Sequence, residues 1–276
     1  MLEPSSKQDL SSVAGEPLTL EKAIANLVDP DVSLRYYAAW WLGKFAPSEP
    51  RVVDALILAL DDEEDRTEMG GYPLRRNAAR ALGKLADVRA VPALIHCLDC
   101  SDYYVREAAA QSLGMLGDRT CIPALMRLLE GGVEGVPLVP GLPHLAQPAE
   151  AAMEALQALK VTEAVPLIQP FLEHPVERVK YAAARAMYGL TQNPVYGEEL
   201  VQAIPKTDLK LRRTLLMDLG ASGYLPGAEA IANASVENSF KIVALKSLLE
   251  NHLQQQETIT LSPQAERVMT LMDSLL

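Results

Sequence analysis

The chain has 276 residues, a formal net charge of −11 and a hydrophobic content of 49%. This acidity excludes the basic stripe that a nucleic-acid backbone requires, and no run of about 18 apolar residues is present to span a membrane. The polar N-terminal segment lacks the apolar core of a secretory signal, and three cysteines fit a reducing cytosol better than a disulfide scaffold.

Two short patterns recur along the chain and predict a stacked solenoid rather than a closed globule. The first carries a proline and is found at Ala90–Leu94, Cys121–Leu125, Ala164–Ile168 and Tyr224–Ala228. The second is richer in alanine and arginine and is found at Leu34–Lys44, Leu74–Lys84, Val105–Met115, Val179–Gly189 and Leu211–Ala221.

The spacing of the prolines gives the length of one unit. Pro92 and Pro123 are 31 residues apart, and Pro166 and Pro226 are separated by 60, or two units. Proline suits the first turn of a helix, and the glycine near the end of each second pattern is typical of a helix stop. Two helices in about 30 residues are typical of short HEAT-like repeats.

We therefore predict an all-α solenoid of about seven two-helix repeats. Residues 1–18 are expected to form a flexible tail, and residues 19–276 a single solenoid closed by a capping helix at Pro263–Leu275. The predicted repeats are Leu20–Phe45, Arg51–Leu85, Ala90–Asp118, Cys121–Leu159, Ala164–Leu190, Gly197–Gly220 and Tyr224–Glu250.

Two insertions interrupt the repeats, at residues 61–73 and 131–147. Both fall between the two helices of a repeat, so both are expected to project from the same edge of the solenoid. Insertions on one edge often mark the binding side of a repeat protein.

Aligned second helices give columns of equivalent residues. One column holds small residues and predicts a helix-packing seam: Ala38, Ala78, Ala109, Ala152, Ala183, Leu215 and Ala244. The column four residues later predicts the core: Leu42, Leu82, Leu113, Leu156, Met187, Leu219 and Leu248.

A basic column, which includes Arg35, Arg106 and Arg212, has two interpretations. It could bind an anionic ligand, or it could support the fold. Because Asp102 and Asp208 precede Arg106 and Arg212 by four residues, we favour a structural ladder of ion pairs within each repeat.

A further pair of columns is mostly polar and is expected to face solvent. In the first repeat these positions hold Tyr36 and Trp40, and in the second they hold Arg76 and Arg80. An exposed aromatic pair beside two arginines suits a conjugated carboxylate ligand or a protein hot spot. Alternatively, the first repeat is a cap whose Trp40 is covered by the tail. Trp41 falls in a column of small residues and is expected to be buried.

Other candidate groups give weaker signals. Cys97 and Cys100 form a CxxC pair without a second pair for zinc or a βαβ context for redox chemistry, so no metal site is predicted. Cys97 is expected in the core and Cys100 in a reachable turn. His144, in the second insertion, is a weak candidate for general acid catalysis.

Several segments of the chain resemble the E chains of the E/F-type phycocyanobilin lyases. They are LRYYAAWWLGKF (Leu34–Phe45), GGYPLRRNAARALGKL (Gly70–Leu85), CSDYYVREAAAQSLGMLGD (Cys100–Asp118), LVPGLPHLAQP (Leu138–Pro148) and FLEHPVERVKYAAARAMY (Phe171–Tyr188). The resemblance covers about residues 20–250. Generic HEAT repeats would share the proline and alanine columns but not these segments.

The resemblance implies a heterodimer with an F-type chain that attaches phycocyanobilin by a thioether to a cysteine of the phycocyanin alpha subunit, and also detaches or transfers it. Phycocyanobilin would be a substrate, with no permanent cofactor, and the location would be the cyanobacterial cytosol. The alternative is a non-catalytic scaffold or chaperone for phycobilisome subunits.

The catalytic residues stay unknown at this stage, with His144, Asp102 and Cys100 as weak candidates. The expected binding residues, for bilin or for the partner chain, are Tyr36, Trp40, Arg76, Arg80, Tyr72, Tyr103 and Tyr104.

Overall fold

The computed structural model describes residues 18–254 and 262–276, and the regular elements within these ranges are all helical. The expected flexible tail, except Leu18, lies outside the described residues. No helix in the described part of the chain has the length and apolarity needed to cross a bilayer.

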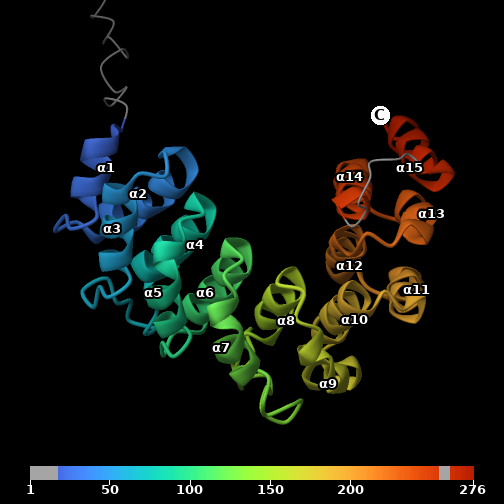
Figure 1. The fold of residues 1–276 in the computed structure, drawn as a ribbon, viewed down its shortest axis with the longest axis horizontal. Coiled ribbons are helices and arrows are strands. Elements are labelled where there is room, and N and C mark those ends of the chain that lie inside the picture. Colours follow the sequence, from blue (N-terminus) through green and yellow to red (C-terminus); the bar gives the residue numbers. More distant parts are fainter. Residues whose placement is uncertain (1–17, 255–261) are drawn as a thin grey trace, which may run out of the picture.

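The helices alternate between two layers that follow an arc (Figure 1). The first helices of the repeats are α1 (Leu20–Asn26), α3 (Pro50–Ala59), α5 (Val91–Cys97), α7 (Ile122–Arg127), α9 (Val165–Ile168), α11 (Pro194–Ala203) and α13 (Ala228–Ala232). The second helices are α2 (Val32–Phe45), α4 (Pro73–Leu85), α6 (Tyr103–Leu116), α8 (Ala149–Ala158), α10 (Glu177–Thr191), α12 (Leu209–Ser222) and α14 (Asn238–Gln254).

Short 3-10 turns accompany many of the first helices. They are η2 (Val88–Ala90), η3 (Arg119–Cys121), η4 (Thr162–Ala164), η5 (Gln169–Glu173), η6 (Ile204–Lys206) and η7 (Leu225–Gly227). A last helix, α15 (Pro263–Asp273), packs on α13 and α14. Each second helix contacts the next one along the stack, which confirms the predicted all-α solenoid.

The two apolar columns form the interior as predicted. Every residue of the small column, from Ala38 to Ala244, has no exposed surface, and the core column from Leu42 to Leu248 is at most 1% exposed. Buried apolar residues separate into two clusters that meet at α10, because Ala183 faces one cluster and Ala184 the other. The interior is therefore a row of interhelical contacts with no single centre.

The glycines near the ends of the second patterns are not helix stops, so that interpretation was wrong. Gly43, Gly83 and Gly114 lie inside helices that each continue for two further residues. A Cβ atom on Gly83 would lie 2.9 Å from the Cα of Ser112, and one on Gly114 would lie 2.8 Å from the Cα of Ala155. These glycines are required because adjacent second helices approach too closely for a side chain.

The predicted ion pairs within the basic column are also wrong. Asp102 and Asp208 cap their own helices by accepting hydrogen bonds from the backbone amides of Tyr104 and Leu211. The arginines instead donate to neighbouring groups, often backbone carbonyls. Arg106 bonds to the carbonyls of Cys100, Ser101 and Ala146, and Arg212 bonds to those of Ile204, Thr207 and Ser235.

These bonds still give the column a structural role. Arg106 joins the turn before α6 to the insertion before α8, and Arg212 joins η6 to the turn before α14. Arg35 binds Asp62 and Glu64 in the first insertion. Each arginine thus connects its own repeat to the next one.

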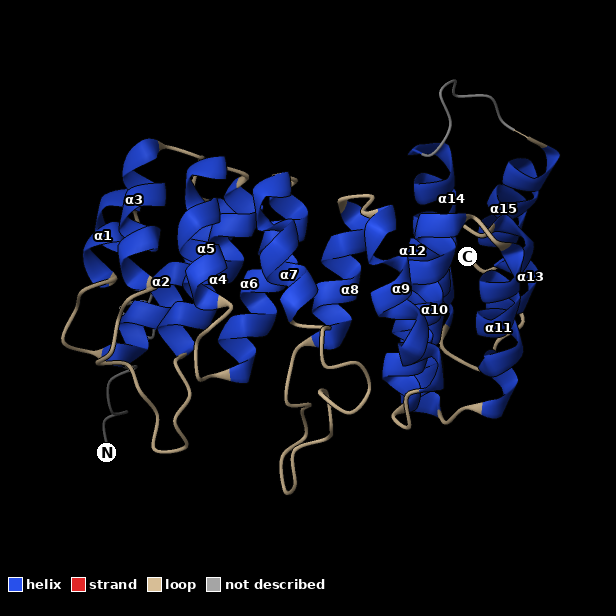
Figure 2. Ribbon diagram, turned by 60° about the horizontal axis from the view of Figure 1, so that its bottom comes forward, coloured by secondary structure: helices blue, strands red, loops and turns tan. Residues whose placement is uncertain are grey.

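The loops formed by the two insertions lie along one edge of the solenoid (Figure 2). The first connects α3 to α4, and the second connects α7 to α8. The second is closed by an isolated antiparallel bridge between Leu138 and Leu145. It is also anchored by His174, whose Nε2 donates to the carbonyl of Val136 over 3.2 Å. The second helices α4 and α6, between these loops, form the base of the candidate site.

Candidate functional site

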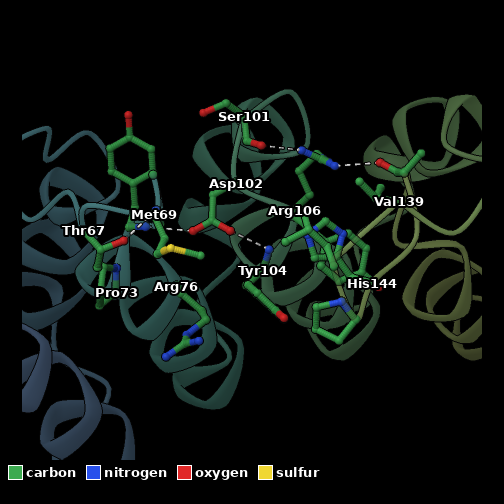
Figure 3. A pocket seen from close by; sticks show the side chains of 17 residues that line it. Thr67, Met69, Pro73, Arg76, Ser101, Asp102, Tyr104, Arg106, Val139 and His144 are labelled. Atoms are coloured by element: carbon green, nitrogen blue, oxygen red, sulfur yellow. Dashed lines mark hydrogen bonds between the residues drawn. The ribbon is translucent and has the colours of Figure 1, made fainter.

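A cavity of about 690 Å³ lies between the two insertions (Figure 3). The loop before α4 supplies residues from Thr67 to Pro73, and the start of α6 supplies residues from Ser101 to Arg106. The second insertion supplies Val139, Leu142, Pro143, His144 and Ala146. This volume lies in the range of about 300–1,000 Å³ that is typical of small-molecule sites.

Three rings form an aromatic wall. His144 stacks on Tyr103 with a centroid separation of 4.4 Å and an interplanar angle of 12°. Tyr104 meets His144 edge-on at 5.6 Å. Burial raises the pKa of Tyr103, so this phenol stays neutral and acts as an apolar surface. The wall offers flat faces to a conjugated ligand.

The ring of His144 has a defined tautomer. Its Nδ1 lies 2.9 Å from the carbonyl oxygen of Leu145, and a carbonyl can only accept a hydrogen bond. Nδ1 therefore carries the proton in the neutral ring, and Nε2 has a free lone pair. No described residue forms a hydrogen bond with Nε2. His144 is thus able to take up a proton at Nε2 and to release it again.

Arg76 is one of two arginines that line the cavity, the other being Arg106. Its guanidinium carbon lies 5.9 Å from the centre of the Tyr104 ring. Its Nε is buried without a hydrogen-bond partner among the described residues. Arg80, one turn further along α4, does not line the cavity and lies 4.0 Å from Glu107. The structure therefore separates two arginines that the sequence placed together.

Two other predicted residues in the cavity have structural partners. Asp102 accepts from the backbone amides of Tyr104 and Tyr72, both at 2.8 Å, and so joins two repeats. The Tyr72 hydroxyl donates to Glu63 over 3.1 Å, and the guanidinium carbon of Arg75 lies 4.3 Å from the centre of its ring. These contacts shape the wall and leave Asp102 poorly suited to proton transfer.

Tyr36 and Trp40 are exposed on α2 and do not line the cavity. Trp40 lies 5.4 Å from Tyr37 and 6.1 Å from Phe45, ring centre to ring centre. Trp41 packs against the core but is only partly buried, so its predicted full burial was wrong. A terminal repeat has no preceding repeat to cover that ring.

The polar columns are not uniformly exposed either. Tyr181 is 8% exposed, and the Arg185 side chain is 12% exposed because it pairs with Asp218 and Glu154. The arc draws neighbouring second helices together and covers part of this face.

The cysteines occupy the predicted environments. Cys97 is buried, and burial raises its pKa to about 12. Cys100 is partly exposed at the rim of two smaller cavities of about 250 and 300 Å³.

Sequence reasoning did not assign Thr67, Met69, Val139 and Leu142 to a site, although all four line the cavity. The signal was present, because all four belong to the insertions. It also missed Glu107 and Glu150, whose pKa values burial raises. Their neighbours come from other repeats, which a single helix pattern does not reveal.

Comparison with known proteins places the chain among close relatives. A family model described as HEAT repeats matches residues 19–113 and 70–136. The chain is 63% identical over 277 residues to the phycocyanobilin lyase subunit alpha of Nostoc sp. (strain PCC 7120), with 100% of both chains covered. It is 55% identical over 262 residues to the subunit of that name from Synechocystis sp. (strain PCC 6803), covering 94% of this chain and 96% of the relative.

A further relative from Nostoc sp., the bilin biosynthesis protein PecE, is 45% identical over 239 residues, covering 86% of this chain and 89% of that protein. Among solved structures, the complex of CpcE and CpcF of phycocyanin lyase from Nostoc sp. PCC7120 contains a chain that matches with a TM-score of 0.85. That chain is 64% identical, and the match covers 99% of this chain and 100% of the other.

Proposed function

This chain belongs to the family of phycocyanobilin lyase alpha subunits, and we propose that it works with an F-type partner chain to attach phycocyanobilin to a cysteine of the phycocyanin alpha subunit. The same pair would also detach or transfer the bilin. The partner is inferred from the solved complex of the Nostoc relative with CpcF. The expected location is the cyanobacterial cytosol, where free thiols persist.

The observation that carries the proposal at the level of residues is the cavity between the insertions. It combines an aromatic wall of Tyr103, Tyr104 and His144 with the guanidinium group of Arg76. A linear tetrapyrrole has a conjugated plane that stacks on aromatic rings and propionate groups that bind guanidinium. We therefore place the bilin against this wall, with a propionate on Arg76.

Attachment is the addition of a thiol across the ethylidene double bond of the bilin. The sulfur forms a bond to the ethylidene carbon, and the thiol proton finishes on the adjacent ring carbon. The enzyme has to hold both reactants in one geometry and move one proton. Nε2 of His144 is suited to accept the thiol proton and return it to the bilin, since Nδ1 is engaged by Leu145.

A scaffold or chaperone without chemistry is the alternative function. It requires no concave site that brings aromatic rings and an arginine together, and for this reason the cavity favours the lyase. Retention of bilin absorbance by the purified heterodimer is expected from the lyase and not from the scaffold.

Arg76→Lys provides the test of the site. Lysine keeps the charge but lacks the planar fork of the guanidinium group. We therefore expect bilin to bind more weakly by about 1.5–3 kcal/mol, which is a loss of affinity of about ten-fold or more. The measurement is the yield of bilin-bearing alpha subunit, read as zinc-induced fluorescence of the denatured protein. Heterodimer formation is checked separately by size exclusion.

Arg80→Lys is the matched comparison, because Arg80 lies on the same helix but outside the cavity. We expect it to retain most of the yield. Equal losses in both variants would extend the bilin surface to Arg80, as the sequence columns predicted. A normal yield from Arg76→Ala would exclude this cavity as the bilin site.

A further inference from the structure

Cys97 and Cys100 lie at the two ends of one tight turn. Cys97 is the last residue of α5, and the backbone amide of Cys100 donates to its carbonyl over 3.2 Å. A turn closed in this way holds its end Cα atoms less than about 7 Å apart, and a disulfide needs about 4.4–6.8 Å. Both residues also line one cavity of about 250 Å³.

The two thiols have different surroundings. Cys100 is partly exposed, and Arg106 donates a hydrogen bond to its backbone carbonyl over 2.6 Å. Its exposure makes Cys100 the thiol of the pair that a peroxide in solution can reach. Cys97 is buried and remains a neutral thiol beside it. This is the arrangement of an attacking thiol with a resolving thiol.

We propose that Cys97 and Cys100 form a reversible disulfide when the chain meets a peroxide. The Cys100 sulfur attacks one peroxide oxygen and becomes a sulfenic acid as the oxygen–oxygen bond breaks, and the other oxygen leaves as water with the thiol proton. The Cys97 sulfur then attacks the Cys100 sulfur, forming the sulfur–sulfur bond and releasing water. Overall, two thiols are oxidised, one hydrogen peroxide is reduced, and two water molecules leave. A dithiol such as dithiothreitol reverses the reaction by exchange.

The turn that would change shape is bonded to the cavity between the insertions. Arg106 holds the carbonyls of Cys100 and Ser101, and its other terminal nitrogen donates to the carbonyl of Ala146 over 2.8 Å. Ala146 is two residues from His144. Closing the disulfide therefore moves an anchor of the aromatic wall. This consequence rests on the proposed function, whereas the disulfide itself does not.

The test uses the full chain, alone and with its F-type partner, treated with hydrogen peroxide and then with dithiothreitol. Cleavage after Arg89 and Arg106 leaves both cysteines in one peptide, residues 90–106. We expect this peptide to lose the mass of two hydrogen atoms after peroxide and to regain it after dithiothreitol. Cys121→Ser is the control, because Cys121 is buried in a separate position, and it should behave like the wild type.

Cys97→Ser separates the two steps. Without the resolving thiol we expect a sulfenic acid at Cys100 that dimedone traps. Oxidation of wild-type Cys100 to sulfinic acid without loss of hydrogen, a disulfide that contains Cys121, or no reaction below the level that unfolds the chain would each overturn the proposal.

Bilin attachment by the heterodimer is measured on the same samples. We expect a lower rate after peroxide and recovery after dithiothreitol. An oxidised peptide with an unchanged rate would refute the coupling to the cavity. A reduced heterodimer that attaches no bilin, but still forms the disulfide, would contradict the proposed function instead.

Discussion

At the scale of single residues, Asp218 carries an ionisable group into the interior. It is 8% exposed and pairs with Arg185 over 3.1 Å. Burial raises its pKa to about 6, despite the opposing effect of Arg185. In the unfolded chain an aspartate titrates near 3.9. The folded state therefore binds this proton more tightly, so the contribution to stability falls as pH rises from about 4 to about 6.

Asp218→Asn removes this titration. A pKa shift of about two units corresponds to about 3 kcal/mol. Between about pH 4 and pH 6, the free energy of unfolding of the wild type should therefore fall by up to about 3 kcal/mol relative to that of the variant. Urea unfolding at a series of pH values from 4 to 7 measures the difference. Parallel curves for the two proteins would show that the environment of Asp218 does not perturb its ionisation.

Single residues differ in how far the sequence reveals them. The columns of Ala38 and Leu42 were predictable because a repeat places equivalent residues in equivalent environments. Arg76 was predictable as a binding residue because two arginines in one repeat stand out in its polar columns. The stacking of His144 on Tyr103 was not, since the two residues are 41 positions apart and one belongs to an insertion without a repeating pattern.

At the scale of elements, Gly83→Ala tests the close approach of α4 and α6. A Cβ atom would meet the backbone of Ser112, and such overpacking costs about 1–3 kcal/mol. This outweighs the gain of about 1 kcal/mol in helix propensity. We expect a lower free energy of unfolding in urea.

Gly189→Ala is the control for Gly83→Ala. It also lies within a helix, but its Cβ would meet only the side chain of Gln157, which can rotate away. It should be neutral or slightly stabilising. Equal destabilisation by the two substitutions would assign the effect to the backbone rather than to the interhelical contact.

Arg212→Ala tests the basic column. The side chain binds three backbone carbonyls, and bonds from a charged donor contribute about 1.5–3 kcal/mol each before partial replacement by water. We expect a loss of about 2–3 kcal/mol in thermal or urea unfolding, because the side chain is partly buried and water replaces part of these bonds. Bilin attachment at a temperature where the variant is folded should be unchanged, because Arg212 is remote from the cavity.

Arg213→Ala is the neighbouring comparison. Arg213 pairs with Glu237 on the surface, and exposed pairs of this kind contribute about 0–1 kcal/mol. If this variant loses as much stability as Arg212→Ala, the carbonyl bonds are not the source of the effect.

Helix positions were largely predictable, whereas their closest contacts were not. Pro92 and Pro123 lie in the first turn of α5 and α7, as predicted, and the period gave the order of the repeats. The sequence does not reveal that Gly117 ends α6 whereas Gly114 permits a close contact with α8, since both have the same side chain. The arginine partners were missed for a similar reason, as backbone carbonyls have no signature in a sequence.

At the scale of the whole molecule, we predict a stable one-to-one heterodimer with the F-type chain. The first repeat exposes Tyr37, Trp40 and Phe45 at 46%, 40% and 55%, a concentration of aromatic surface that favours a protein partner. Size exclusion with light scattering measures the stoichiometry. The isolated chain should leave the alpha subunit largely unmodified, and full-rate attachment by this chain without its partner would contradict the prediction.

The position of the cavity has a mechanical consequence. Its lining comes from three successive repeats: Arg76 belongs to the second, Tyr103 and Tyr104 to the third, and His144 to the fourth. Each repeat contacts mainly its two neighbours, so a solenoid bends by small rotations at every junction between adjacent repeats. Bending at the two junctions that flank the third repeat changes the distances of Arg76 and His144 from the two tyrosines. The width of the cavity therefore depends on the curvature of the whole solenoid. A protein bound to both ends of the arc can widen or narrow the cavity without contacting it.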